Sequence, residues 1–118
     1  MDNLTNKLDQ YSRLLTSYLG ELAQERNTAL GATADCHVIA DTRNHHYQLT
    51  RMGWEGRKYY FSVLLHFSIK PDGKIWIQQN STEILVGREL EDRGVSKADI
   101  VVGFRPEYLR AATGYAVA

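Results

Sequence analysis

Polar and apolar residues alternate along residues 58–69, which predicts a long β-strand with one buried face. Every odd-numbered position in it is apolar: Tyr59, Phe61, Val63, Leu65, Phe67 and Ile69. The next five residues read Lys-Pro-Asp-Gly-Lys, a composition typical of a tight turn. We therefore predict a hairpin in which Ile69 lies opposite Ile75 and Phe67 lies opposite Ile77. A shift of one residue would turn both isoleucines to the other face.

Two further strands are predicted before the long one, at 33–41 and 46–54. They form a hairpin around Thr42-Arg43-Asn44, with Asp41 opposite His46. A turn at 55–57 then leads into the long strand. Setting Trp54 opposite Lys58 brings Leu49 opposite Val63 and Tyr47 opposite Leu65. In this register one face collects small and large apolar residues: Cys36, Val38, Ala40, Tyr47 and Leu49.

The first 26 residues carry apolar side chains at a spacing of four and three, the pattern of an amphipathic helix. The stripe consists of Leu4, Leu8, Tyr11, Leu15, Tyr18 and Leu22. Asp2 or Asn3 can cap the first turn. We expect the stripe to pack on the sheet; a coiled-coil seam to a partner is the alternative.

Shorter elements are predicted after the hairpins. Ser81 or Thr82 can cap a short helix that runs to Arg93, and 100–104 reads as a short buried strand. A helical turn at 106–110 and an apolar C-terminal segment follow. The predicted fold class is α+β, within a single domain of residues 1–118: an N-terminal amphipathic helix packed on a four-stranded antiparallel meander, then a short helix, a short strand and a packed C-terminal segment.

The second face of the predicted sheet is too apolar to remain in water. We expect it to be covered by the C-terminal segment or by a second copy of the chain, which makes a homodimer the structural expectation. The candidate partner or dimer interface consists of Met52, Trp54, Tyr60, Leu64, His66 and Trp76.

The composition disfavours a protein that coats nucleic acid. Among 118 residues, fourteen basic and fourteen acidic side chains give a formal net charge of zero. A locally basic stretch leaves direct DNA contact as an alternative, through Arg43, Arg51, Arg57 and Lys58. Cys36 is the only cysteine, so an internal disulfide is excluded. With neither a secretion signal nor an apolar membrane span, we expect a cytoplasmic protein.

The search for catalytic chemistry yields one weak candidate. The predicted registers set His46 opposite His66, and His66 opposite Gln78, but place no carboxylate on that row. We therefore predict no catalytic residues, no metal site and no cofactor. Arg105 and Arg110 are candidates for contact with an anion or a partner; salt bridges with Asp99 and Glu107 are the alternative that we favour.

Three stretches together resemble one family. They are Gly53-Trp54-Glu55-Gly56, then 66–80 with its Gly-Lys-Ile-Trp-Ile-Gln-Gln run, and finally 94–104 with the ending Thr-Gly-Tyr-Ala-Val-Ala. The chain resembles the XisI family, the fdxN element excision controlling factors of cyanobacteria. It departs from the family pattern near Arg105, where a histidine is expected, which puts a partner contact at that position in doubt.

The resemblance implies a non-enzymatic accessory factor that controls excision of a DNA element by a site-specific recombinase, through an XisH-like partner. Three other hypotheses stay open. The chain acts as an antitoxin-like inhibitor of a nuclease-like companion, binds DNA directly, or is a metal-dependent enzyme that uses His46 and His66.

Overall fold

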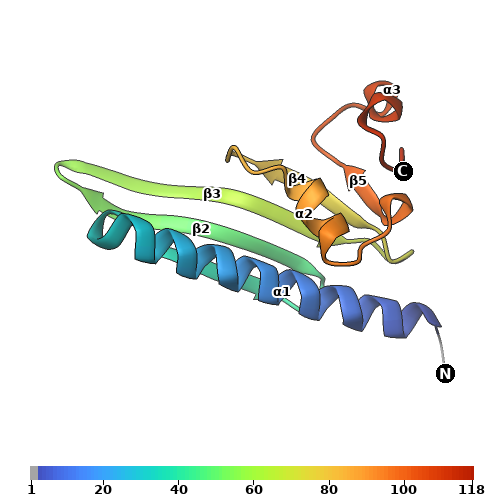
Figure 1. The fold of residues 1–118 in the computed structure, drawn as a ribbon, viewed down its shortest axis with the longest axis horizontal. Helices are drawn as coiled ribbons and strands as arrows, with labels where there is room; N and C mark the ends of the chain where they lie inside the picture. The colour runs from blue at the N-terminus through green and yellow to red at the C-terminus, as the bar shows by residue number, and fades with distance from the viewer. Residues whose placement is uncertain (1–2) are drawn as a thin grey trace.

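The computed structural model describes residues 3–118, and it places a long helix along one face of a sheet (Figure 1). The helices are α1 (Asn3–Leu30), α2 (Val86–Asp92) and α3 (Glu107–Arg110), and the strands are β1 (Cys36–Asp41), β2 (His46–Glu55), β3 (Lys58–Ile69), β4 (Ile75–Asn80) and β5 (Ile100–Val102). Single 3-10 turns lie at Gly31–Thr33, Lys97–Asp99 and Ala111–Thr113. The predicted capping residue Asp2 lies outside the described residues.

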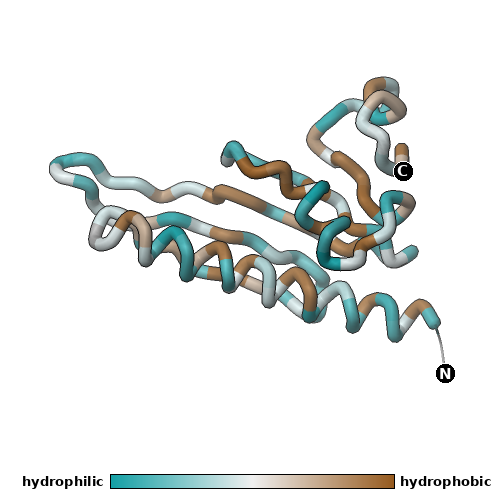
Figure 2. Tube along the Cα trace, viewed as in Figure 1, coloured by the Kyte–Doolittle hydropathy of each residue, from teal (hydrophilic) through white to brown (hydrophobic). Residues whose placement is uncertain are grey.

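The α+β prediction is confirmed, with one addition to the sheet. The five strands follow the order β1-β2-β3-β4-β5, so β5 extends the predicted four-stranded meander, and it runs parallel to β4. The α1 stripe packs on the sheet: its members Leu15 and Tyr18 are completely buried, as is the neighbouring Leu19. Hydrophobic segments gather where α1, β3, β4 and β5 meet, whereas the β2–β3 turn is hydrophilic (Figure 2). No helix in residues 3–118 combines the length and the apolar character needed to cross a bilayer.

Two of the predicted hairpins have the expected register next to their turns. Ile69 pairs with Ile75 and Phe67 with Ile77, while Asp41 pairs with His46. In the first turn Gly73 adopts a φ of +88°, which favours glycine. In the second turn the Asp41 carboxylate accepts hydrogen bonds from the backbone N–H groups of Arg43 and Asn44, which fixes the turn locally.

The predicted register between β2 and β3 is wrong for two reasons: Glu55 pairs with Lys58, so the turn has two residues instead of three, and β3 contains a β-bulge. Leu49 pairs with Leu65 but Thr50 pairs with Val63, so Leu64 is one extra residue on β3. From there to the turn, Trp54 lies opposite Tyr59 instead of Lys58. The extra residue reverses which side chains of β3 face α1.

This reversal corrects two sequence-based assignments. Leu65 and Phe67 are completely buried beneath α1, but Tyr59 and Phe61 are 52% and 67% exposed on the opposite face. Tyr60 was predicted on that opposite face, yet it lies on the α1 side, where the Arg51 guanidinium carbon is 4.2 Å from its ring centroid.

A second bulge lies on β4. Phe67 pairs with Ile77 but His66 pairs with Gln79, which leaves Gln78 as the extra residue. The prediction that His66 lies opposite Gln78 is therefore wrong. The Gln78 side chain instead donates a hydrogen bond from Nε2 to the hydroxyl of Ser68, 3.0 Å away.

Tyrosine hydroxyls join α1 and the C-terminal segment to carboxylates of the C-terminal half. Tyr11 donates to Asp99 and Tyr18 to Glu89, each at 2.6 Å, and Tyr115 donates to Glu91 at 2.7 Å. Burial, with these carboxylate contacts, raises the pKa of Tyr11 and of Tyr115 to about 12 and raises the pKa of Tyr18 as well. Lys7 adds an ion pair to Asp99 at 2.8 Å.

Close packing at Gly87 gives a stability prediction. A methyl group on Gly87 would lie 2.8 Å from the Tyr115 hydroxyl, so Gly87→Ala must displace that ring and its bond to Glu91. Overpacking of this kind costs about 1–3 kcal/mol, more than the gain of about 1 kcal/mol from helix propensity. Urea denaturation should therefore show that Gly87→Ala lowers the free energy of unfolding.

Gly20 provides the matched control, because it lies inside α1 with nothing within 4 Å of an added methyl group. Gly20→Ala should raise the free energy of unfolding by about 0.5–1 kcal/mol. Equal effects of the two substitutions would contradict the packing described for Gly87.

Candidate functional site

The sheet face opposite α1 carries four apolar residues near the β2–β3 turn, of which three are exposed and Met52 is half-buried. We call Met52, Trp54, Tyr59 and Phe61 the distal patch. The side chain of Trp54 is 65% exposed, and its ring centroid lies 5.1 Å from that of Tyr59. Met52 pairs with Phe61 on the neighbouring strand. The two cross-strand pairs together form one apolar surface, because directly opposite residues project from the same face.

A row of hydrogen-bonded polar side chains crosses the middle of this face. Gln48 donates from Nε2 to the Thr50 hydroxyl at 3.0 Å, so its Oε1 accepts from Nδ1 of His66 at 2.9 Å. The Nε2 atom of His66 then accepts from Nδ1 of His46 at 3.1 Å. Burial and the neighbouring His46 lower the pKa of His66.

The two predicted histidines therefore meet, although not in the predicted way. His46 pairs with Ser68 across the strands, and its ring reaches His66 diagonally. Within residues 3–118, no three side chains of histidine, cysteine, aspartate or glutamate gather where they could hold a metal ion. What the row does is fix the ring orientations of both histidines.

The C-terminal segment covers the other end of this face. Trp76 has two cations near its ring: Nζ of Lys70 is 5.2 Å from the ring centroid, and the guanidinium carbon of Arg110 is 4.9 Å away. Arg110 also donates hydrogen bonds to the carbonyls of Arg105 and Val117. Of the two predicted covers, the C-terminal segment thus accounts for Trp76, but the distal patch remains open.

The guanidinium groups of Arg105 and Arg110 make different contacts within the chain. The Arg110 guanidinium is occupied by the contacts just described, while that of Arg105 lies 5.3 Å from the ring centroid of its neighbour Phe104. Asp99, one of the expected salt-bridge partners, pairs with Lys7 instead.

Three of the four basic residues of the predicted DNA contact lie near the β2–β3 turn: the guanidinium carbon of Arg51 and Nζ of Lys58 are 4.2 and 4.8 Å from the Tyr60 ring centroid, and Arg57 lies in the turn. Arg51 is occupied by Glu55, at 2.9 Å, and by the Tyr60 ring. Arg43 precedes β2 and Arg57 follows it, so the strand's ten residues separate them by about 33 Å. Arg43 therefore lies apart from the other three residues, so the four side chains do not form one continuous phosphate-binding strip.

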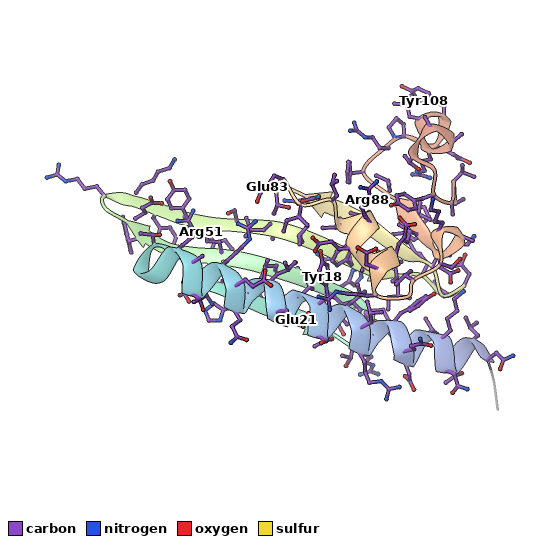
Figure 3. The ribbon with its side chains drawn as sticks, in the orientation of Figure 1. Tyr18, Glu21, Arg51, Glu83, Arg88 and Tyr108 are labelled. Atoms are coloured by element: carbon purple, nitrogen blue, oxygen red, sulfur yellow. The ribbon has the colours of Figure 1, made fainter. Side chains whose placement is uncertain are left out.

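A cleft of about 270 Å³ lies at the C-terminal end of the molecule, and sequence reasoning missed it. Its lining includes Leu85, Arg88, Phe104 and Tyr115, which come from segments far apart in the chain. Figure 3 shows Arg88 on α2 and Tyr108 on α3 near this end, whereas Arg51 lies on the long hairpin. The cleft and the distal patch are therefore separate surfaces.

Comparison with known proteins identifies the family. The family model described as "XisI protein" matches residues 5–117, which is nearly the whole chain. This chain belongs to the XisI family. No curated protein sequence matches it significantly.

Two solved structures from Anabaena variabilis ATCC 29413 have the same fold as this XisI-family chain. One is a XisI-like protein with 37% sequence identity and a TM-score of 0.84, and the match covers 94% of this chain and 99% of that one. The other is described as fdxN element excision controlling factor XisI. It has 28% identity and a TM-score of 0.77, with 95% and 99% of the two chains covered.

The lowered pKa of His66 gives a pH prediction. An unfolded chain binds a proton at His66 more readily than the folded chain does, so folding stability is lost as pH falls below about 6.5. Between pH 7.5 and 5.5 the thermal unfolding midpoint should fall by more in the unaltered chain than in His66→Gln. The control is His37→Gln, which leaves His66 in place and should keep the larger fall. Identical pH dependence of the unaltered chain and His66→Gln would contradict the burial of His66.

Proposed function

We propose that this chain is a cytoplasmic, non-enzymatic regulatory factor that controls excision of a DNA element by binding a companion protein through the distal patch. The observation that carries this proposal is the exposure of Trp54, Tyr59 and Phe61 on one rigid sheet face. Aromatic residues held in fixed positions are enriched in the centres of protein interfaces.

The surroundings of the distal patch favour a protein partner. The patch lies on paired strands, so its side chains are already held in place before binding, which lowers the entropy cost of association. Arg57 lies in the β2–β3 turn at the rim of the patch, whereas Nζ of Lys58 is 4.8 Å from the Tyr60 ring centroid, on the α1 side of the sheet. An apolar centre with a charged rim is the usual arrangement of a transient interface.

The family gives the biological setting. A solved relative is described as an excision controlling factor of the fdxN element, and the sequence resemblance implies an XisH-like companion and a site-specific recombinase. For this chain we infer the same role: it associates with its XisH-like companion and thereby controls when recombination occurs. The proposal assigns binding to the distal patch and no bond-making step to the chain.

Co-purification from cells that express both proteins tests the proposal. Trp54→Asp places a charge in the centre of the distal patch, so it should weaken retention of the XisH-like protein at least tenfold, on the scale of about 2 kcal/mol typical of an aromatic interface residue. Because Trp54 is 65% exposed, the variant should still fold, which circular dichroism can verify.

Tyr108→Asp is the matched control, since Tyr108 is 81% exposed at the opposite end of the molecule. It should retain the companion as the unaltered chain does. The proposal fails if Trp54→Asp still retains the companion fully, or if Tyr108→Asp alone loses it, because binding would then lie at the C-terminal end.

A further inference from the structure

Part of β3 has an open backbone edge. The β4 strand accompanies β3 only between Leu65 and Ile69. Beyond it, Gln79 donates from its side chain to the Val63 carbonyl, and the Ser81 N–H donates to the Leu64 carbonyl. Within residues 3–118, no strand pairs with this side of 58–62. An open edge of this kind presents a ready template for another strand.

The backbone groups that face this edge can be identified. The Met52 N–H donates to the Asp35 carbonyl at 3.0 Å, so the backbone groups of Met52 point away from β3. Met52 and Phe61 are therefore a non-hydrogen-bonded pair, and the N–H and C=O of Phe61 point to the open edge. Backbone directions alternate along a strand, so the N–H and C=O of Tyr59 also point to the open edge. Those of Tyr60 point the other way, toward Gly53.

We propose that a second copy of this chain pairs antiparallel with this edge, about a two-fold axis at Tyr60. In this register Tyr59 of each copy lies opposite Phe61 of the other. Both residues direct N–H and C=O to the edge, so the two pairs exchange four hydrogen bonds. The result is a continuous sheet that joins β3 of one copy to β3 of the other.

The backbone selects this register over its neighbours. A shift of one step toward β4 would set Tyr59 opposite Val63, whose carbonyl already accepts a hydrogen bond from Gln79. A shift the other way would set Phe61 opposite Arg57, which lies in the turn before β3. A shift by a single residue would pair residues whose side chains project from opposite faces of the sheet.

The side chains of the edge are complementary to themselves, which is why we assign it to a second copy. In the proposed register, Trp54 and Tyr59 of one copy continue into Phe61 and Met52 of the other, and symmetry repeats this row of four. Cross-strand aromatic pairs of this kind stabilise sheets. Lys58 lies opposite Ser62 and not opposite another lysine. A net charge of zero adds no overall repulsion between copies.

Self-pairing would also enlarge the surface of the proposed function. A strand added in the plane of the sheet leaves the face opposite α1 open, so the distal patches of the two copies become one continuous surface. Self-pairing uses the backbone edge and the lateral contacts of Tyr59 and Phe61 across it, whereas companion binding uses the outer surface of the patch. The two events can therefore be tested separately.

Sedimentation of the chain alone, over a concentration series, should show a dimer. Its register is then tested by a disulfide. Because Tyr60 lies on the axis as a non-hydrogen-bonded pair, its two Cα atoms would be about 4.5 Å apart, within reach of an S–S bond. With Cys36 replaced by alanine, Tyr60→Cys should crosslink at least tenfold faster than Ser62→Cys under mild oxidation.

Ser62→Cys is the matched control, because Ser62 lies on the same strand and the same face as Tyr60. Its two copies would be four residues apart along the strand, about 14 Å, which is too far for a disulfide. The proposal is overturned if the chain is a monomer at all concentrations, or if Ser62→Cys crosslinks as fast as Tyr60→Cys. Under reducing conditions, the Tyr60→Cys chain should still retain the companion. If it loses the companion but still crosslinks under oxidation, the result counts against the companion-binding role and supports the dimer.

Discussion

The single extra residue at Leu64 determines how this molecule divides its apolar surface. On one side of the bulge, β3 directs Leu65 and Phe67 into the core beneath α1. On the other side the same strand directs Tyr59 and Phe61 away from the helix. An unbroken alternation would have placed all four residues on the α1 side, and the opposite face would have lacked its aromatic surface. The bulge thus separates the residues that stabilise the fold from those available for recognition.

Contacts of α1 and of the C-terminal segment hold the rest of the fold in place around the bulged strand. Tyrosine hydroxyls of α1 bind carboxylates on α2 and in the turn before β5, so the long helix is joined to the C-terminal half as well as to the sheet. Hydrogen bonds of a phenol to a carboxylate are charge-assisted and stronger than neutral ones. The C-terminal segment in turn covers Trp76 through Arg110. Among the described residues, the hairpin beyond the bulge has neither a helix nor a tail over its outer face.

The sequence predicts the fold class, the helix stripe and the registers next to two turns, because local chemistry determines them. Proline, aspartate and glycine mark the β3–β4 turn, and Asp41 organises the β1–β2 turn. The bulge has no such marker. Its only trace is the consecutive apolar run Val63-Leu64-Leu65, where strict alternation would place a polar residue in the middle. The parallel placement of β5 depends on long-range contacts, which no local pattern encodes.

The candidate site was predicted only in part, because the bulge has no marker in the sequence. Met52 and Trp54 lie on β2, which keeps its alternation, so they were assigned to the correct face. The β3 residues were displaced by one position, so Tyr60 took the place that belongs to Tyr59 and Phe61. His46 and His66 are in contact although their predicted pairing was wrong, because their rings are long enough to meet diagonally.

The contrast between the two tryptophans has an optical consequence. Trp54 is open to solvent beside Tyr59, whereas Trp76 has Lys70 and Arg110 near its ring and a buried indole nitrogen. Indole emission depends on the polarity around the ring, so the two fluorophores report on separate ends of one sheet face. Acrylamide in solution can reach Trp54 far more easily than Trp76. The intrinsic fluorescence of the chain thus distinguishes events at the hairpin from events at the C-terminal segment without an added label.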